Sequence, residues 1–346
     1  MKFPTPRLRT LLVVILLVAL GWSGWWFFAA GAQQKAYEGW LEDRRSEGWL
    51  AEAGRISVTG FPFRFDTLVE DLSLAEPQEG WAWHAPEFQV MALAYRPNHI
   101  IAAWPGEQRI STPEQTVTVS GETLRGSVRF RPSTDLDLEG STIEMDGVSA
   151  RSSLGWEARL QHGVLAVRRA ADGSAPENSY DVSLEARRLE VPDMLRGLIE
   201  GQGVLAPLLD HVSLDTTLAF DSPWNRRSVE GRKPVLSAMA LRKADILWGD
   251  LRFSARGRLR VNQLGQPEGE LEITAQNWKR MLQTAVEAGL VPRDLYGTLE
   301  AGLGVVAMLS GDPDTLRAPL TFSGGQVRIG PVPLGETPVL DVPNAG

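Results

Sequence analysis

The twenty residues from Leu11 to Ala30 carry no charge, and this run constrains the chain more than any other feature of its sequence. As an α-helix with a rise of about 1.5 Å per residue, the run is about 30 Å long, the thickness of one hydrocarbon core. Three basic residues precede the run, Lys2, Arg7 and Arg9, and no acidic residue precedes it. This asymmetry favours a cytoplasmic N-terminus. Residues 1–32 are therefore predicted to be a stub and a single-pass inner-membrane anchor, with the body in the periplasm.

A cleaved signal peptide is the alternative interpretation of this segment. Ala30-Gly31-Ala32 fits the small-x-small cleavage rule, which would leave Gln33 as the new N-terminus. Bulky aromatic residues crowd the stretch before that site and suit the outer membrane interface, which favours a retained anchor. They are Trp22, Trp25, Trp26, Phe27 and Phe28. Under both alternatives the rest of the chain is exported. The body is therefore predicted to be periplasmic in either case, and only cleavage after Ala32 is left open.

Composition narrows the classes of function that the body can have. Apolar residues make up 43% and charged residues 23% of the chain, a mixture typical of a globular protein with a sizeable core. The net charge of −8 makes it a poor binder of nucleic acid, which needs clustered cations against its phosphates. The absence of cysteine excludes disulfides and thiol-based metal or nucleophile chemistry.

Alternating apolar and polar residues dominate the body and predict strands with one apolar face. The clearest run has Val212, Leu214, Leu218 and Phe220 on one face and polar residues between them. A second run, residues 251–261, continues through a polar turn at 262–269 into Leu271 and Ile273, which predicts an antiparallel hairpin. The predicted fold is mainly β (α+β), a curved antiparallel sheet with a few packed helices and one N-terminal transmembrane helix.

Helical periodicity interrupts these strands in a few places. A short juxtamembrane helix is predicted within 33–49, and further helices at about 192–209, 277–290 and 293–310. Segment 171–179 contains Gly, Ser, Pro and Asn and predicts a surface loop. We place a boundary there, which divides the periplasmic body into two β-rich halves, 33–170 and 171–346.

No catalytic, cofactor-binding or metal-binding residues are predicted. None of the four histidines is paired at helical spacing with another, and no H-E-x-x-H occurs. Asp135-x-Asp137-x-Glu139-Gly140 begins like a calcium loop, but its twelfth position is Asp146 instead of Glu, and an acidic strand is favoured. Gly201-x-Gly203-x-x-Ala206 resembles a dinucleotide-binding motif, but that motif follows a strand. A helical pattern precedes it here, so the end of a helix is favoured. No cofactor is expected, and the protein is predicted not to be an enzyme.

Aromatic residues on the predicted strands and helices are most often core residues, but they also suit the wall of an apolar groove. Trp81 and Trp83 share a strand face, and Tyr95 begins a turn-like segment before Trp104. The candidate groove residues are Trp81, Trp83, Tyr95, Trp104, Phe253 and Trp278.

Four short motifs together resemble one family. They are Gly60-Phe61-Pro62, Trp81-Ala82-Trp83, residues 95–99 (YRPNH) and residues 323–331 (SGGQVRIGP). With these the chain is similar, over nearly its whole length, to the alphaproteobacterial family called domain of unknown function 2125, which implies no activity or site residues. The anchor, the G-F-P element and the alternating strands also resemble AsmA-like envelope proteins more remotely. That likeness implies an exported β body with a groove, linked to lipid movement or outer-membrane assembly.

The leading functional hypothesis is a membrane-anchored periplasmic protein that binds lipid or another apolar ligand in a β groove. The alternative is a structural or assembly partner for cell-envelope proteins, without catalysis of its own. A hydrolase whose site converges only in the fold is a third hypothesis. The partners expected are the inner membrane, lipid and envelope proteins, and not nucleic acid.

Overall fold

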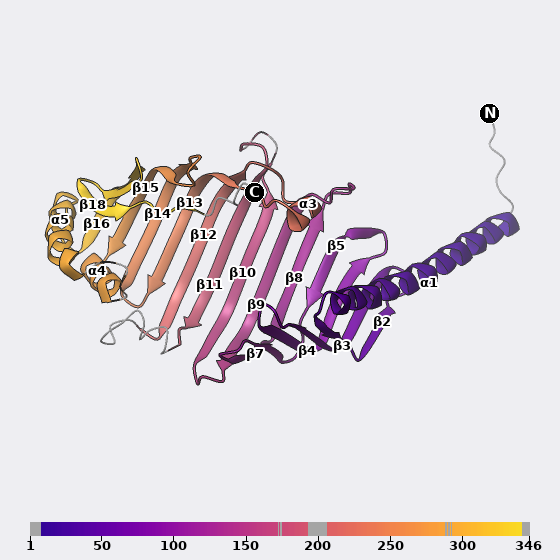
Figure 1. The fold of residues 1–346 in the computed structure, drawn as a ribbon. Helices are drawn as coiled ribbons and strands as arrows, with labels where there is room; N and C mark the ends of the chain where they lie inside the picture. The colour runs from indigo at the N-terminus through magenta and orange to yellow at the C-terminus, as the bar shows by residue number, and fades with distance from the viewer. Residues whose placement is uncertain are drawn as a thin grey trace, which may run out of the picture. The chain divides into compact units, whose positions relative to one another are not determined.

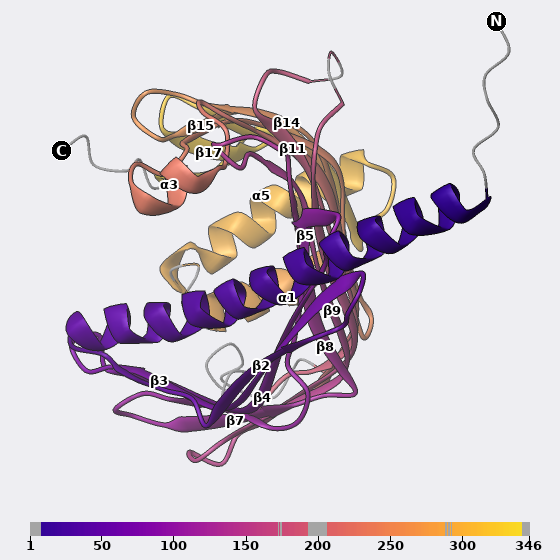
Figure 2. The same ribbon diagram turned by 90° about the vertical axis from the view of Figure 1, so that its right-hand side faces the viewer.

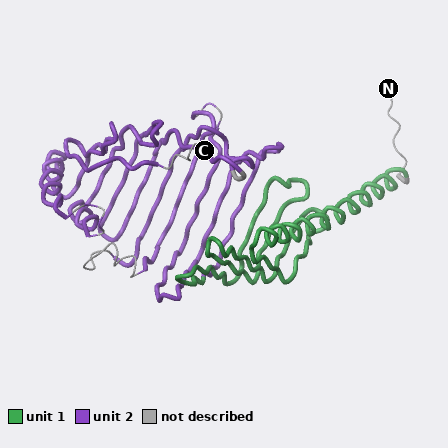
Figure 3. Tube along the Cα trace, in the orientation of Figure 1, with its two compact units in different colours: residues 1–118 green, residues 119–346 purple. Residues whose placement is uncertain are grey.

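The computed structural model describes residues 8–171, 173, 175–192, 206–287, 289, 291 and 293–340. The chain divides into two compact units, Met1–Thr118 and Val119–Gly346, which Figure 3 shows in green and purple. The loop at 171–179, where the sequence suggested a boundary, lies within the second unit between two paired strands.

The first unit consists of a long helix and a small antiparallel sheet (Figure 1). At the centre of the sheet, β3 pairs with β1 and β2 along one edge and with β4 along the other, and β4 also pairs with β5 and β6. The elements are α1 (Leu8–Ser46), β1 (Leu50–Glu52), β2 (Arg55–Thr59), β3 (Arg64–Glu76), β4 (Trp81–Leu93), β5 (Arg96–Ala103), β6 (Gln108–Ser111) and β7 (Thr116–Ser120), which contains the boundary between the units.

The predicted anchor and the predicted juxtamembrane helix are one continuous helix, α1, of 39 residues. No proline separates them, and a single glycine such as Gly31 costs a helix only about 1 kcal/mol. The helix is long and apolar enough to cross a membrane by its length and composition. Side chains from Leu11 to Leu20 are largely exposed, whereas Trp26 and Leu41 are buried against the sheet. Figure 2 shows α1 passing over β2 and β3.

A local change in β3 and β4 reverses which residues face α1. In β3 the buried residues are Phe65, Thr67 and Val69, but beyond Asp71 they are Leu72 and Leu74. Asp71 has a positive φ of 56°, a left-handed conformation that turns the next side chain to the opposite face. The paired register omits Asp71, passing from Glu70 opposite Glu87 to Leu72 opposite Ala85. Simple alternation along the sequence therefore fails at this point.

The second unit is an antiparallel meander in which each strand pairs with the next along the chain. Its strands are β8 (Thr123–Phe130), β9 (Leu138–Ser152), β10 (Glu157–Arg169), β11 (Ser179–Glu190), β12 (Leu208–Phe220), β13 (Leu236–Trp248), β14 (Leu251–Val261), β15 (Pro267–Gln276), β16 (Thr315–Ser323), β17 (Gln326–Ile329) and β18 (Val332–Glu336). The mainly antiparallel β fold is confirmed, and the predicted hairpin is β14–β15.

Two predicted helices of the second unit are present. The helix at 277–290 is α4 (Trp278–Glu287), and the helix at 293–310 comprises η1 (Arg293–Leu295) and α5 (Tyr296–Leu309). A short helix, α3 (Arg226–Glu230), was not predicted. The helix predicted at about 192–209 falls mainly on residues 193–205, which lie outside the described residues, and its last two positions belong to β12.

Candidate functional site

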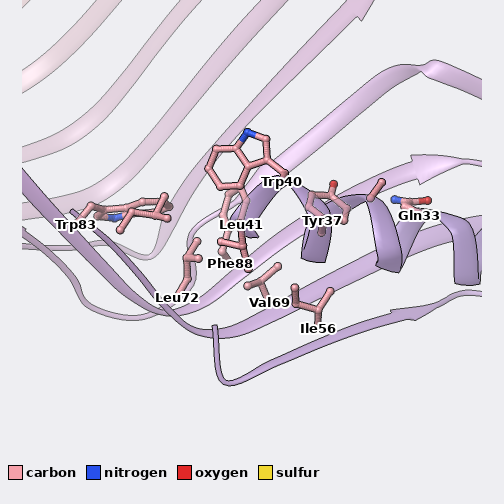
Figure 4. A pocket seen from close by; sticks show the side chains of 11 residues that line it. Gln33, Tyr37, Trp40, Leu41, Ile56, Val69, Leu72, Trp83 and Phe88 are labelled. Atoms are coloured by element: carbon pink, nitrogen blue, oxygen red, sulfur yellow. The ribbon is translucent and has the colours of Figure 1, made fainter. Parts of the chain in front are cut away.

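An apolar groove of about 560 Å³ lies in the first unit, between the second half of α1 and strands β2–β4. Figure 4 shows its side chains converging from the helix and from the sheet. None of the lining residues is an acid, a lysine, an arginine or a histidine. They are Gln33, Ala36, Tyr37, Trp40, Leu41, Ile56, Val69, Leu72, Leu74, Trp83 and Phe88.

The helical side of the groove is a single face of α1. Gln33, Ala36, Tyr37, Trp40 and Leu41 recur at the i, i+3, i+4, i+7, i+8 spacing of one helical stripe. Leu41 is buried at the sheet, whereas the Trp40 side chain is 44% exposed and Ala36 is also exposed. The stripe covers about 12 Å of helix. The groove is thus bordered by the same helix whose preceding residues form the apolar span.

The sheet side of the groove depends on the change of face at Asp71. Val69, before the change, and Leu72 and Leu74, after it, are all buried within one apolar cluster. From β4, the rings of Trp83 and Phe88 meet edge to face with centroids 5.8 Å apart. Residues of both parities therefore point to the same side, and the apolar wall continues past Asp71 although the alternation in the sequence changes phase there.

One set of polar side chains belongs to the groove. Gln33 Nε2 donates to Thr67 Oγ1 at 2.9 Å, and burial at the same place raises the pKa of the Tyr37 hydroxyl. Thr67 itself is 1% exposed, so the network fixes α1 on β3. With one uncharged polar cluster and apolar walls elsewhere, the groove suits an elongated apolar molecule and offers no ionic partner for a charged one.

The residues predicted for a groove fall into two separate groups. Trp83 lines the groove, Trp81 meets Trp49 edge to face at 5.3 Å, and the Trp104 ring lies 5.7 Å from that of Phe88. Tyr95 is 59% exposed and does not line the groove. In the second unit, Phe253 packs against the core cluster and Trp278, 2% exposed, belongs to it.

The patterns in the sequence did not predict the helical wall or most of the sheet wall. Tyr37, Trp40 and Leu41 carried a usable signal, because their helical spacing marks an apolar stripe. Nothing in that spacing indicates which strands the stripe meets. Val69 and Phe88 were missed because the period-two pattern changes phase at Asp71 in β3 and at Pro86 in β4.

The second unit presents a second apolar surface, defined by the register of its sheet. One row of directly paired residues crosses from β9 to β16 and is entirely apolar. In order, it contains Ile143, Leu165, Leu184, Leu214, Ala244, Ala255, Ile273 and Ala318. The adjacent row on the opposite face is mostly polar and contains Glu144, Val164, Glu185, Ser213, Asp245, Ser254, Thr274 and Arg317.

Helices α4 and α5 cover only part of this apolar face. Ala255, Ile273 and Ala318 are buried in a cluster with Trp278, and Leu299 and Leu303 of α5 belong to the same cluster. Towards β9 the row becomes half-buried, and Ile143 is exposed. Among the described residues, the apolar row is therefore buried at the β14–β16 end, half-buried over β10–β13 and exposed at Ile143 of β9.

A smaller cavity of about 430 Å³ in the first unit contains a serine and a histidine. Ser73 and His84 are opposite each other on β3 and β4, and Ser73 Oγ lies 3.1 Å from His84 Nδ1. Asp71 Oδ1 is 3.8 Å from His84 Nε2, and its side chain is 75% exposed. In a catalytic triad the serine meets Nε2 and a buried carboxylate orients Nδ1, so this arrangement has the opposite order. It gives no support to a hydrolase.

The other polar clusters have structural roles. Asp135 pairs with Arg227 at 2.7 Å and Asp137 accepts from Asn225, so these acids join a loop to α3. Hydrogen bonding from Arg242 lowers the pKa of Asp215 on the polar sheet face. Within the described ranges, no group of three or more His, Cys, Asp or Glu residues is placed to hold a metal ion.

The model of one protein family, described as an uncharacterized protein conserved in bacteria (DUF2125), matches residues 26–338. The match covers most of the chain, including the groove and the sheet of the second unit, and the chain belongs to this family. Neither the curated proteins nor the solved structures gave a match. The family description carries no activity, so function has to be argued from the geometry.

Proposed function

We propose that this member of the DUF2125 family is a single-pass inner-membrane protein that binds the acyl chain of a lipid in the groove of its first unit. The observation that carries the proposal is the continuity of α1. Residues 11–30 are long enough to span a bilayer, and the stripe that begins at Gln33 forms one wall of an apolar groove of about 560 Å³. That volume lies within the roughly 300–1,000 Å³ of small-molecule sites.

The hydrophobic effect supplies the driving force for this binding. Each methylene group removed from water contributes about 0.8 kcal/mol. Half-buried and exposed rings such as Trp83 and Trp40 would be covered by the same event. Because no lining residue is ionic, a charged headgroup would stay outside and only the chain would enter.

The charges that flank the span support the proposed orientation. Arg7 and Arg9 precede it, which favours a cytoplasmic N-terminus and therefore a periplasmic body. The apolar row of the second unit is less covered over β9–β11 than over β14–β16, and this apolar surface also supports an apolar ligand. No arrangement on the described residues favours catalysis, so the proposed role is binding.

Native mass spectrometry of the full chain tests the proposal. The protein would be released from detergent micelles after stripping of loosely held lipid, and phosphatidylethanolamine would be titrated back. We expect a discrete adduct with the mass of a single lipid that saturates during the titration. A distribution of adducts without saturation, identical to that of an unrelated single-pass protein, would refute a specific site. A bound protein in place of lipid would favour the assembly role.

A further inference from the structure

The loop between β2 and β3 is fastened to the part of α1 that precedes Ala30. The indole Nε1 of Trp22 donates to the Pro62 carbonyl oxygen at 2.9 Å, and that of Trp26 donates to the Arg64 carbonyl oxygen at 2.9 Å. Trp26 is 3% exposed and stacks on Phe65 with centroids 5.5 Å apart. The loop therefore keeps a fixed height along the helix axis.

Large aromatic side chains at this end of the first unit remain exposed. Phe61 is 47% exposed and Phe63 is 61% exposed, and the Phe61 ring stacks on Phe27 of α1 at 5.4 Å. Ala94 N donates to the Phe63 carbonyl oxygen at 2.8 Å, which brings the turn containing Tyr95 beside the loop. We call these exposed residues the aromatic rim: Trp25, Phe27, Phe28, Phe61, Phe63 and Tyr95.

The length of the apolar span decides what covers the aromatic rim. Arg9 is the last charge before the span and Lys35 is the first charge after it. A hydrocarbon core about 30 Å thick accommodates about twenty helical residues, so the core that begins after Arg9 ends near Ala30. Phe27 lies just inside that limit, and Phe61, stacked on Phe27, has to lie at the same depth.

We propose that Phe63, Phe61 and Tyr95 of the body insert into the outer interface of the bilayer that α1 spans. Tryptophan and tyrosine favour this level, where an apolar ring meets a polar boundary. The two indole hydrogen bonds satisfy carbonyl groups that would otherwise lose water, which reduces the cost of inserting the loop. Arg64 and Arg96, which follow the inserted residues, are exposed, so their long side chains can extend outwards to lipid phosphates.

This contact would fix the first unit on the membrane at more points than its helix alone. Strand β3 runs from the loop towards Ala75, which pairs with Leu50, over a distance of about 35 Å. Leu50 therefore marks the end of the unit far from the bilayer. The inference needs α1 to span a membrane, but it does not depend on what occupies the groove.

The absence of native cysteine allows a direct test with single labels on the full chain. Phe63→Cys and Tyr95→Cys would carry an environment-sensitive fluorophore in vesicles of phosphatidylethanolamine and phosphatidylglycerol. Leu50→Cys is the matched control, because Leu50 is 63% exposed and Phe63 61%. Leu16→Cys, at 58% exposed within the span, reports on the anchor itself.

We expect the labels at 63 and 95 to be quenched several-fold more strongly than the label at 50, and most strongly by a nitroxide near the lipid headgroup. The label at 16 should be quenched best by a nitroxide deep in the acyl chain. Quenching at 63 and 95 equal to that at 50, with the label at 16 quenched, would overturn the inference and leave the anchor intact. A label at 16 that no lipid nitroxide quenches would overturn both.

Discussion

Replacing Ala36 with tryptophan is expected to weaken lipid binding by about tenfold or more. Ala36 is exposed and lines the groove, so the indole would occupy the space of the ligand without entering the buried cluster. Displacing only two methylene groups at about 0.8 kcal/mol each removes about 1.6 kcal/mol, and 1.4 kcal/mol corresponds to a factor of ten. Titration of phosphatidylethanolamine, followed by native mass spectrometry, measures the change.

Lys35→Trp is the matched control for Ala36→Trp. It adds the same side chain to the same helix one position away, at an exposed residue that does not line the groove. We expect Lys35→Trp to bind as the unaltered protein does. Equal weakening by both variants would show that the added indole acts through the helix or the membrane and that the groove is not the binding site.

The second large effect is expected at Trp26, where substitution by alanine should destabilise the first unit by about 3–5 kcal/mol. The Trp26 side chain is 3% exposed, stacks on Phe65 and donates to the Arg64 carbonyl oxygen. Trp26→Phe keeps an aromatic ring but leaves that acceptor without its indole donor, so a smaller loss of about 1–3 kcal/mol is expected. Hydrogen exchange of the β2 and β3 amides in detergent micelles reports the stability of this unit directly.

Phe28→Ala serves as the control for the Trp26 variants. Phe28 is on the same helix and is 77% exposed, so its truncation removes little packing within the protein. Protection of β2 and β3 should fall in the order Phe28→Ala, Trp26→Phe, Trp26→Ala, with Phe28→Ala close to the unaltered chain. Equal protection in all three would mean that α1 does not support the sheet.

The sequence predicts the elements of this protein better than their meeting points. The uncharged run at 11–30 has the length of a membrane-spanning helix, and the structure contains it in α1. The residues at 251–261 alternate with the period of a strand, and the structure forms β14 there. The continuity of α1 could not be predicted, because helix 33–49 carries polar residues and resembles a separate surface helix. Gly31 is tolerated within α1 where a proline would have ended it.

The candidate site was predicted only at Trp83. Periodicity indicates which side chains share a face, but it does not indicate which face another element covers. Trp83 and Trp278 therefore carried the same signal, although one lines a groove in the first unit and the other lies in the core of the second. On the sheet side, Asp71 is the reason that β3 was not predicted to line the groove, because its left-handed conformation changes the phase of the strand and brings Val69 and Leu72 to one side.

The proposed function requires an acyl chain to lie between α1 and β2–β4. Phosphatidylethanolamine with a photoactivatable group in its acyl chain, added to membranes that contain the full protein, tests this directly when the cross-linked peptides are sequenced. We predict cross-links in the α1 segment around Trp40 and in the β4 segment around Trp83 and Phe88, with Ala36→Trp suppressing both. Cross-links confined to residues 11–30, and unaffected by Ala36→Trp, would contradict the account.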